Sequence, residues 1–167
     1  MKYPNLEKLV DIIAVLRSEN GCEWDREQTH KSLRPNMLEE AYEAVDAIDE
    51  GDISNLREEL GDVLLQVVLH AQIAKDDGEF DIEDVAKELS DKLIHRHPHV
   101  FGNTEVHSTQ EILDNWDKLK KEEKTYRKSV LDGISKSQSA LMSAQKISKK
   151  VVKVGFEWDC VDSLKNC

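Results

Sequence analysis

Residues 38–62 read LEEAYEAVDAIDEGDISNLREELGD, and this stretch decides the fold of the 167-residue chain. Its apolar residues recur at helical spacing on both sides of Gly51-Asp52, so two helices are predicted, with Asp52 or Ser54 capping the second. A connection this short makes neighbouring helices pack antiparallel. Acidic residues three or four positions apart share one face of each helix. We therefore expect carboxylates to converge between the two helices, drawn from Glu39, Glu40, Glu43, Glu59 and Asp62.

Helical periodicity also dominates the rest of the chain, and no strand pattern appears in it. We therefore predict an all-α fold, most simply a helix bundle. Asn5, Asp81 and Ser108 are the predicted N-caps of further helices. Residues 21–35 and 95–102 are predicted to be irregular, the second because a residue before proline avoids helical dihedral angles. The predicted helices cover approximately residues 6–19, 34–50, 53–76, 82–94, 108–123 and 137–153.

Apolar stripes mark the faces of these helices that the sequence predicts to be buried. The stripe before Gly51 comprises Met37, Leu38, Ala41, Val45 and Ile48, and the inward face after Asp81 comprises Ile82, Val85, Leu89 and Leu93. Stripes on several helices also indicate burial across a subunit interface, without giving the number of subunits.

The composition favours a soluble cytoplasmic domain. The chain has 34 acidic and 23 basic residues, a formal net charge of −11, and 39% hydrophobic residues. That is too apolar for a disordered acidic tail and too polar for a membrane protein. No apolar run approaches the roughly 18–20 residues that a membrane span needs, and the N-terminus shows no secretory signal. Three cysteines without a CxxC motif support neither a disulfide framework nor a zinc cage.

Charge is distributed unevenly along the chain. Residues 36–62 hold ten acidic residues and one basic residue, whereas residues 118–153 hold eleven basic residues and three acidic ones. The acidic centre disfavours a nucleic acid partner, because phosphate would be repelled unless a cation intervened. A nucleic-acid module on the basic stretch stays an alternative, although a solvated helix face is the simpler interpretation.

The converging carboxylates need an opposite charge beside them. Like charges at this spacing repel and raise one another's pKa. Arg57 is the only basic residue within residues 36–62, so salt bridges inside the stretch cannot neutralise it. A hard divalent cation with oxygen ligands offsets the repulsion directly, and Mg²⁺ is suitable because it keeps waters and substrate phosphates as its other ligands. The alternative is a pair of acidic helices that face solvent.

The MazG family of nucleoside triphosphate pyrophosphohydrolases has an EExxE…ExxD signature, which this chain resembles at residues 39–43 and 59–62. Other stretches match in the order of the family and extend the resemblance over residues 6–159. Glu23 departs from the family pattern, which usually has proline after the cysteine. The further matches are Gly21-Cys22-Glu23-Trp24-Asp25, Arg96-His97-Pro98-His99-Val100-Phe101, Asn115-Trp116, Ala144-Gln145-Lys146 and Val154-Gly155-Phe156.

This resemblance implies an all-α dimer that uses Mg²⁺, with Mn²⁺ as the alternative ion. It also implies hydrolysis of nucleoside or deoxynucleoside triphosphates to the monophosphate and pyrophosphate, as housecleaning of the nucleotide pool. Carried over by position, Glu40, Glu43, Glu59 and Asp62 would be metal ligands. Glu39 would be an extra ligand or would orient the attacking water. The chemistry agrees, because carboxylate-bound metal both neutralises phosphate charge and makes a water nucleophilic.

Cationic side chains should hold the phosphates of such a substrate. Lys92 and Arg96 are four residues apart and match the family's K-x-x-x-R pattern, and Lys120 is a further candidate. Trp116 either stacks on the nucleotide base or packs between helices.

The chain most resembles the N-terminal half of the two-repeat bacterial form of the family. We predict a catalytic-type helical domain over residues 1–130, followed over residues 131–167 by a linker helix and the start of a truncated second repeat. The pattern G-x-E-W-D supports this division, because it occurs at residues 21–25 and again at residues 155–159. Two functions remain open: an active pyrophosphohydrolase, or a weakly active or inactive dimerisation and regulatory half.

Overall fold

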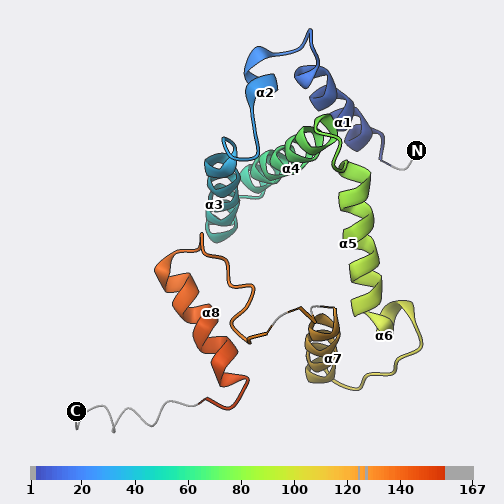
Figure 1. Cartoon of the computed structure of the whole chain (residues 1–167), viewed down its shortest axis with the longest axis vertical. Coiled ribbons are helices and arrows are strands. Elements are labelled where there is room, and N and C mark those ends of the chain that lie inside the picture. Colours follow the sequence, from blue (N-terminus) through green and yellow to red (C-terminus); the bar gives the residue numbers. More distant parts are fainter. Residues whose placement is uncertain (1–2, 124, 127, 157–167) are drawn as a thin grey trace, which may run out of the picture. The chain divides into compact units, whose positions relative to one another are not determined.

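The computed structural model describes residues 3–123, 125–126 and 128–156 as helices joined by loops (Figure 1). No strand occurs among these residues, which confirms the predicted all-α fold. The contacts divide the chain into two compact units, of which the first ends at Leu93 and the second begins at Ile94. The helices are α1 (Pro4–Arg17), α2 (Glu23–Glu27), α3 (Arg34–Glu50), α4 (Ile53–Asp76), α5 (Ile82–Arg96), α6 (Pro98–Phe101), α7 (Thr109–Glu122) and α8 (Ala140–Val152).

Local chemistry sets the ends of the two helices that carry the acidic residues. α3 ends at Gly51, whose φ of 71° lies in the left-handed region that favours glycine. α4 begins after Asp52, whose carboxylate accepts hydrogen bonds from the backbone N–H groups of Ser54 and Asn55, both at 3.0 Å. The predicted cap at Asp52 is therefore confirmed, and the short connection makes α3 and α4 a helical hairpin.

The other predicted helix starts are confirmed at two positions of three. Asp81 caps α5 by accepting hydrogen bonds from two backbone N–H groups of its first turn. Ser108 accepts a hydrogen bond from the N–H of Glu111 at the start of α7. The predicted cap at Asn5 is wrong, because α1 already begins at Pro4, whose fixed φ suits the first turn of a helix.

Two short helices lie where the sequence predicted irregular chain. α2 falls within residues 21–35, and α6 falls within residues 95–102. The second prediction failed because the restriction imposed by Pro98 acts on His97, which is not helical (φ −121°, ψ 56°), while the proline itself occupies the first turn of α6.

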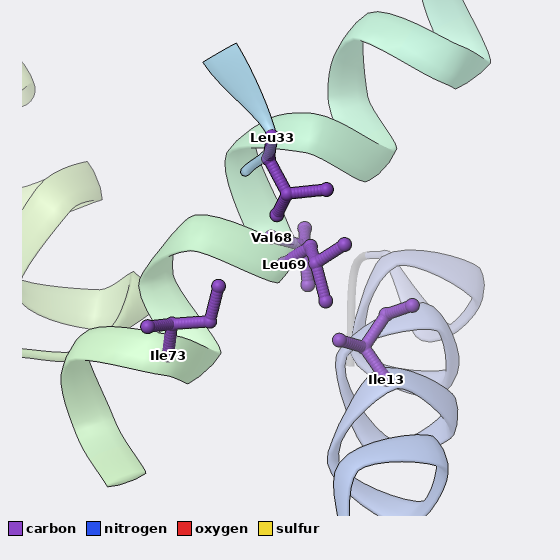
Figure 2. Packing of buried hydrophobic residues seen from close by; sticks show 5 residues of the cluster. All are labelled: Ile13, Leu33, Val68, Leu69 and Ile73. Carbon is purple, nitrogen blue, oxygen red and sulfur yellow. The ribbon is translucent and has the colours of Figure 1, made fainter. Parts of the chain in front are cut away.

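The core of the first unit is a small apolar cluster (Figure 2). Ile13 from α1 meets Val68, Leu69 and Ile73 from α4, and Leu33 joins them from the residue before α3. Leu33 and Val68 are fully buried. This cluster fixes α1 and the start of α3 against the second half of α4.

α3 turns its small residues, and not its large apolar ones, toward the interior. Ala44 and Ala47 are 7% and 1% exposed, whereas the predicted stripe residues Leu38, Val45 and Ile48 are 53%, 49% and 59% exposed. These three large side chains are therefore not buried within the chain, and their burial across a subunit interface stays a prediction. Alanine lets two helix backbones approach closely, so α3 packs on α4 through its alanines and leaves the large side chains on the opposite face.

The predicted inward face of α5 is correct at its beginning only. Ile82 packs against the core cluster and Val85 is half-buried. Leu89 and Leu93 are 50% and 45% exposed, so the prediction is wrong for them. The reason is that the core cluster lies at the start of α5, and the later turns extend past it.

Polar contacts fasten the connection between α1 and α3. The guanidinium of Arg17 donates to the Asp76 carboxylate at 2.8 Å and to the backbone carbonyls of Asp25 and Gln28 at 2.5 and 3.2 Å. These bonds tie α1 to α2 and to the end of α4. The Nδ1 atoms of His30 and His70 lie 2.7 Å apart, which ties the connection before α3 to α4.

The second unit uses part of its basic charge for internal contacts. Lys150 on α8 donates to the backbone carbonyls of Val130 and Asp132 at 2.6 and 3.0 Å, and Lys153 pairs with Asp117 on α7. The second copy of the G-x-E-W-D pattern lies largely outside the described residues. The predicted domain boundary after residue 130 was based on a sequence repeat and not on contacts. The division of the chain after Leu93 does not test it, so it stays a prediction.

None of the described helices combines the length and the hydropathy that crossing a bilayer requires.

We expect Leu33→Ala to lower the free energy of unfolding by about 2–5 kcal/mol, because it leaves a cavity beside Val68 and Ile13. Leu141→Ala is the matched control, since Leu141 is 85% exposed, and it should change the free energy by less than about 0.5 kcal/mol. Urea denaturation followed by circular dichroism measures both. Equal losses in the two variants would contradict the assigned core.

Candidate metal centre

Three glutamates from two helices converge in the first unit. Glu40 and Glu43 lie one turn apart on α3, and Glu59 lies in the second turn of α4. Each offers one carboxylate oxygen to a group in which all the oxygens lie within 4.8 Å of one another. Glu40 and Glu59 are half-buried and Glu43 is exposed. The hairpin thus brings together residues that are nineteen positions apart in the sequence.

Asp62 and Glu39 lie beside this group and not within it. The negative charge of the half-buried Asp62 contributes to raising the pKa of both Glu40 and Glu59, so Asp62 lies within electrostatic range of the group. Glu39 is exposed, and its charge acts on Glu40. All five predicted acidic residues therefore belong to one neighbourhood, but they do not contribute equally to its centre.

The three glutamates and Asp62 crowd negative charge at the α3–α4 contact. Partial burial, followed by the charges of Asp62 and Glu43, raises the pKa of Glu40 above its ordinary value. Partial burial, followed by the charges of Glu43 and Asp62, raises the pKa of Glu59 as well. Among the ion pairs of the described residues, none links a cationic side chain to these carboxylates. The group therefore has the charge that a cation would neutralise.

The donor set suits a hard divalent cation. Oxygens bound to one Mg²⁺ at about 2.1 Å lie about 3 Å apart when adjacent and about 4.2 Å apart when opposite. Oxygens that already lie within 4.8 Å of one another reach this spacing through small rotations of the glutamate side chains. Carboxylates without nitrogen or sulfur donors favour Mg²⁺, Mn²⁺ or Ca²⁺ over Zn²⁺. The site can hold such an ion through Glu40, Glu43 and Glu59, with Asp62 beside them.

The predicted substrate-binding residues are divided between the two units. Lys92 belongs to the first unit and pairs with Glu88 one turn away, at 3.7 Å. Arg96, Trp116 and Lys120 form one cluster in the second unit. The guanidinium carbon of Arg96 lies 5.4 Å from the centre of the Trp116 ring, and the Lys120 ammonium lies 4.5 Å from it. Their roles toward a substrate stay predictions.

Sequence analysis missed one member of this second cluster, Glu123. The Nε–H of Arg96 donates one bifurcated hydrogen bond to the two carboxylate oxygens of Glu123, at 3.0 and 3.2 Å, and Nη2 donates a further one. The pair spans twenty-seven residues and joins the end of α5 to the residue after α7. No local spacing could have revealed it, because the contact depends on how the chain returns from α6 to α7.

The chain matches one protein family along its centre. The MazG nucleotide pyrophosphohydrolase domain matches residues 28–101. This range includes all five predicted acidic residues together with Lys92 and Arg96, and it ends before Trp116 and Lys120.

Relatives match over most of the chain. A protein of Thermotoga maritima named nucleoside triphosphate pyrophosphohydrolase/pyrophosphatase MazG is 50% identical over 153 residues, which are 91% of this chain and 58% of the relative. A nucleoside triphosphate pyrophosphohydrolase of Escherichia coli K12 is 47% identical over 156 residues, which are 92% of this chain and 59% of the relative. The chain thus spans about three fifths of the length of these relatives.

A solved structure has a related fold. The crystal structure of a MazG-related protein from Thermotoga maritima superposes with a TM-score of 0.59 at 31% sequence identity. The match covers 69% of this chain and 98% of the other.

Adding Mg²⁺ to the metal-free protein should raise its melting temperature, because an ion at a hundredfold excess over its Kd adds about 2.7 kcal/mol to the folded state. Glu40→Gln should remove most of this rise. It should also raise the melting temperature of the metal-free protein, since it deletes a charge that its neighbours repel. Calorimetry measures both effects, with the exposed Glu50→Gln as the control. An unchanged response of Glu40→Gln to Mg²⁺ would eliminate Glu40 as a ligand.

The stability difference between Glu40→Gln and the parent protein should also change with pH in a definite direction. The folded state raises the pKa of Glu40, so it binds a proton that the unfolded state releases in the interval above pH 4.5. The contribution of Glu40 to stability without metal should therefore increase as the pH falls from neutral toward 4.5. Over this interval, the difference in melting temperature between Glu40→Gln and the parent should shrink. A difference that grows on acidification would show that the Glu40 charge is stabilised and not repelled.

Proposed function

The chain belongs to the MazG nucleotide pyrophosphohydrolase family, and from this premise we propose that it converts a nucleoside or deoxynucleoside triphosphate and water into the monophosphate and pyrophosphate. The observation that carries the proposal is the convergence of Glu40, Glu43 and Glu59 within 4.8 Å, with no opposite charge paired to them in the described part of the chain. We further propose housecleaning of the nucleotide pool as the physiological role. A cytoplasmic location stays a prediction.

Mg²⁺, or Mn²⁺ in its place, fits the carboxylates, and when bound it supplies charge neutralisation at phosphate oxygens and a more acidic water. Glu40, Glu43 and Glu59 would hold the ion, and Asp62, from the next turn of α4, would complete the ligand set. Glu39 lies at the edge of the group, where its carboxylate can accept a proton from the attacking water or serve as an extra ligand. The α3–α4 hairpin holds these residues close together before substrate arrives.

The triphosphate is itself strongly negative, so the carboxylates alone would repel it. We assign Lys92, Arg96 and Lys120 to its phosphates, because each is a cationic side chain with a flexible or forked donor group. Trp116 is assigned to the nucleotide base by stacking. Its closeness to Arg96 and Lys120 favours a role in the same ligand site over simple core packing.

We also propose that the protein is a homodimer. The face of α3 opposite the carboxylates exposes Leu38, Tyr42, Val45 and Ile48, and α4 exposes Leu60 at 54%. A continuous helical stripe of this kind is costly to leave in water. A second copy that covers the stripe would leave the carboxylates on the other face accessible.

A second candidate function is that of a dimerisation and regulatory half with little turnover of its own. This alternative comes from the resemblance of the chain to one half of the two-repeat form of the family. Complete convergence of the acidic group favours activity instead. Pyrophosphate release by this chain alone, compared with that of a full-length relative, distinguishes the two functions. Nucleic acid binding through the basic stretch remains the least favoured alternative.

Glu43→Gln should reduce Mg²⁺-dependent pyrophosphate release from nucleoside triphosphates by roughly a hundredfold or more, since it removes one ligand oxygen charge from the group. Glu50→Gln changes an exposed glutamate of the same helix outside the group and should leave turnover unchanged. A coupled pyrophosphate assay over all common nucleotides measures both. Undiminished turnover in Glu43→Gln would remove the proposed mechanism.

Val45→Glu should convert the dimer to a monomer, because it places a charge in the middle of the exposed stripe on α3. Val152→Glu is matched in chemistry and in exposure, at 50% against 49%, but lies on α8. Sedimentation velocity measures the oligomeric state of both variants. The proposal fails if the parent protein is a monomer, or if Val45→Glu sediments as a dimer.

A further inference from the structure

Glu123 binds one edge of the Arg96 guanidinium group. Glu123 receives the hydrogen bonds of Nε and Nη2, which form one edge of the planar group. The arginine side chain is 8% exposed and the Glu123 side chain 25%. The hydrogen bonds to Glu123 raise the pKa of Arg96 above its ordinary value, so the guanidinium stays charged. The other edge, formed by Nη1, binds no acceptor among the described residues.

Trp116 lies beside the same group. The guanidinium carbon lies 5.4 Å from the ring centre, within the range of cation–π attraction. The Lys120 ammonium lies 4.5 Å from the same ring, so two cations share one aromatic platform. Arg96 is therefore bound along one edge by Glu123 and shares an aromatic neighbour with Lys120.

We infer that Glu123 is a positioning residue, which aims the Nη1 edge of Arg96 at a phosphate of the substrate. The inference rests on the proposed function, in which Arg96 binds phosphate. Arginine recognises phosphate through parallel N–H donors, and such bonds depend strongly on the direction of the fork. A guanidinium held in advance loses less conformational entropy on binding than a free one. Glu123 then contributes to affinity without touching the substrate.

A role in which Glu123 competes with phosphate predicts the opposite change in KM. If Glu123 competed with phosphate for Arg96, its removal would free the arginine and tighten binding. If the pair were only structural, its removal would lower stability and leave affinity unchanged in the folded protein. The three roles therefore differ in the direction in which KM moves.

The test compares Glu123→Gln, Glu123→Ala and the control Glu122→Gln, which changes the exposed neighbouring acid. We expect KM for nucleoside triphosphate to rise about tenfold in Glu123→Gln, more in Glu123→Ala, and not at all in Glu122→Gln. The kcat should stay within about twofold, because Glu123 does not touch the reacting atoms. Thermal melting ensures that only folded variants are compared, and the glutamine variant keeps an acceptor for Arg96 if the alanine variant fails to fold.

Two further measurements isolate the mechanism. In an Arg96→Lys background, Glu123→Gln should add no further rise in KM, because the residue acts through the arginine fork. Binding of inorganic tripolyphosphate, measured by calorimetry without turnover, should weaken about tenfold in Glu123→Gln relative to the parent. The inference is overturned by an unchanged or lowered KM, by additive effects in the double variant, or by equal tripolyphosphate affinities. Absence of turnover in a parent protein that binds tripolyphosphate would instead count against the proposed function alone.

Discussion

The repulsion among the carboxylates of Glu40, Glu43 and Glu59 is the constraint on which the first unit depends, because packing must hold them together against it. That packing comes from α3 and α4, which meet through Ala44 and Ala47. Small side chains bring the helix backbones close, and the carboxylates one turn away are brought close with them. A divalent cation converts the same repulsion into binding energy. The stability of the hairpin and the affinity of the site are therefore linked.

The same arrangement explains the unusual face of α3. A helix at the surface of a globular protein normally buries its large apolar residues and exposes its acids. α3 instead buries alanines and half-buries Glu40, while Leu38 and Ile48 remain in water. Ala44, Ala47 and the half-buried Glu40 occupy the inner face, and the large side chains lie elsewhere on the helix. The proposed dimer follows from this displacement, since a second copy would cover what the fold leaves exposed.

The second unit gathers positive charges in place of negative ones. Arg96 and Lys120 are brought to one tryptophan ring, and Glu123 provides the compensating charge. In the first unit the acids lie together without a paired cation among the described ion pairs, whereas here a charge inside the cluster is already paired. An unpaired cluster suits an exchangeable ion, and a paired cluster suits a ligand that must be oriented.

Local spacing in the sequence predicted the six longer helices, most of the caps assigned to them and the acidic group, but not the short helices α2 and α6. These features follow from spacing within a few residues, as at Asp52 and at Glu40-Glu43, where backbone geometry alone fixes which side chains are neighbours. The tertiary structure decided which apolar face is buried and which partner Arg96 takes. Leu38 and Ala44 occupy equally regular helical positions, and only the approach of α4 selects between them. Glu123 reaches Arg96 across twenty-seven residues, through a chain path that no local pattern encodes.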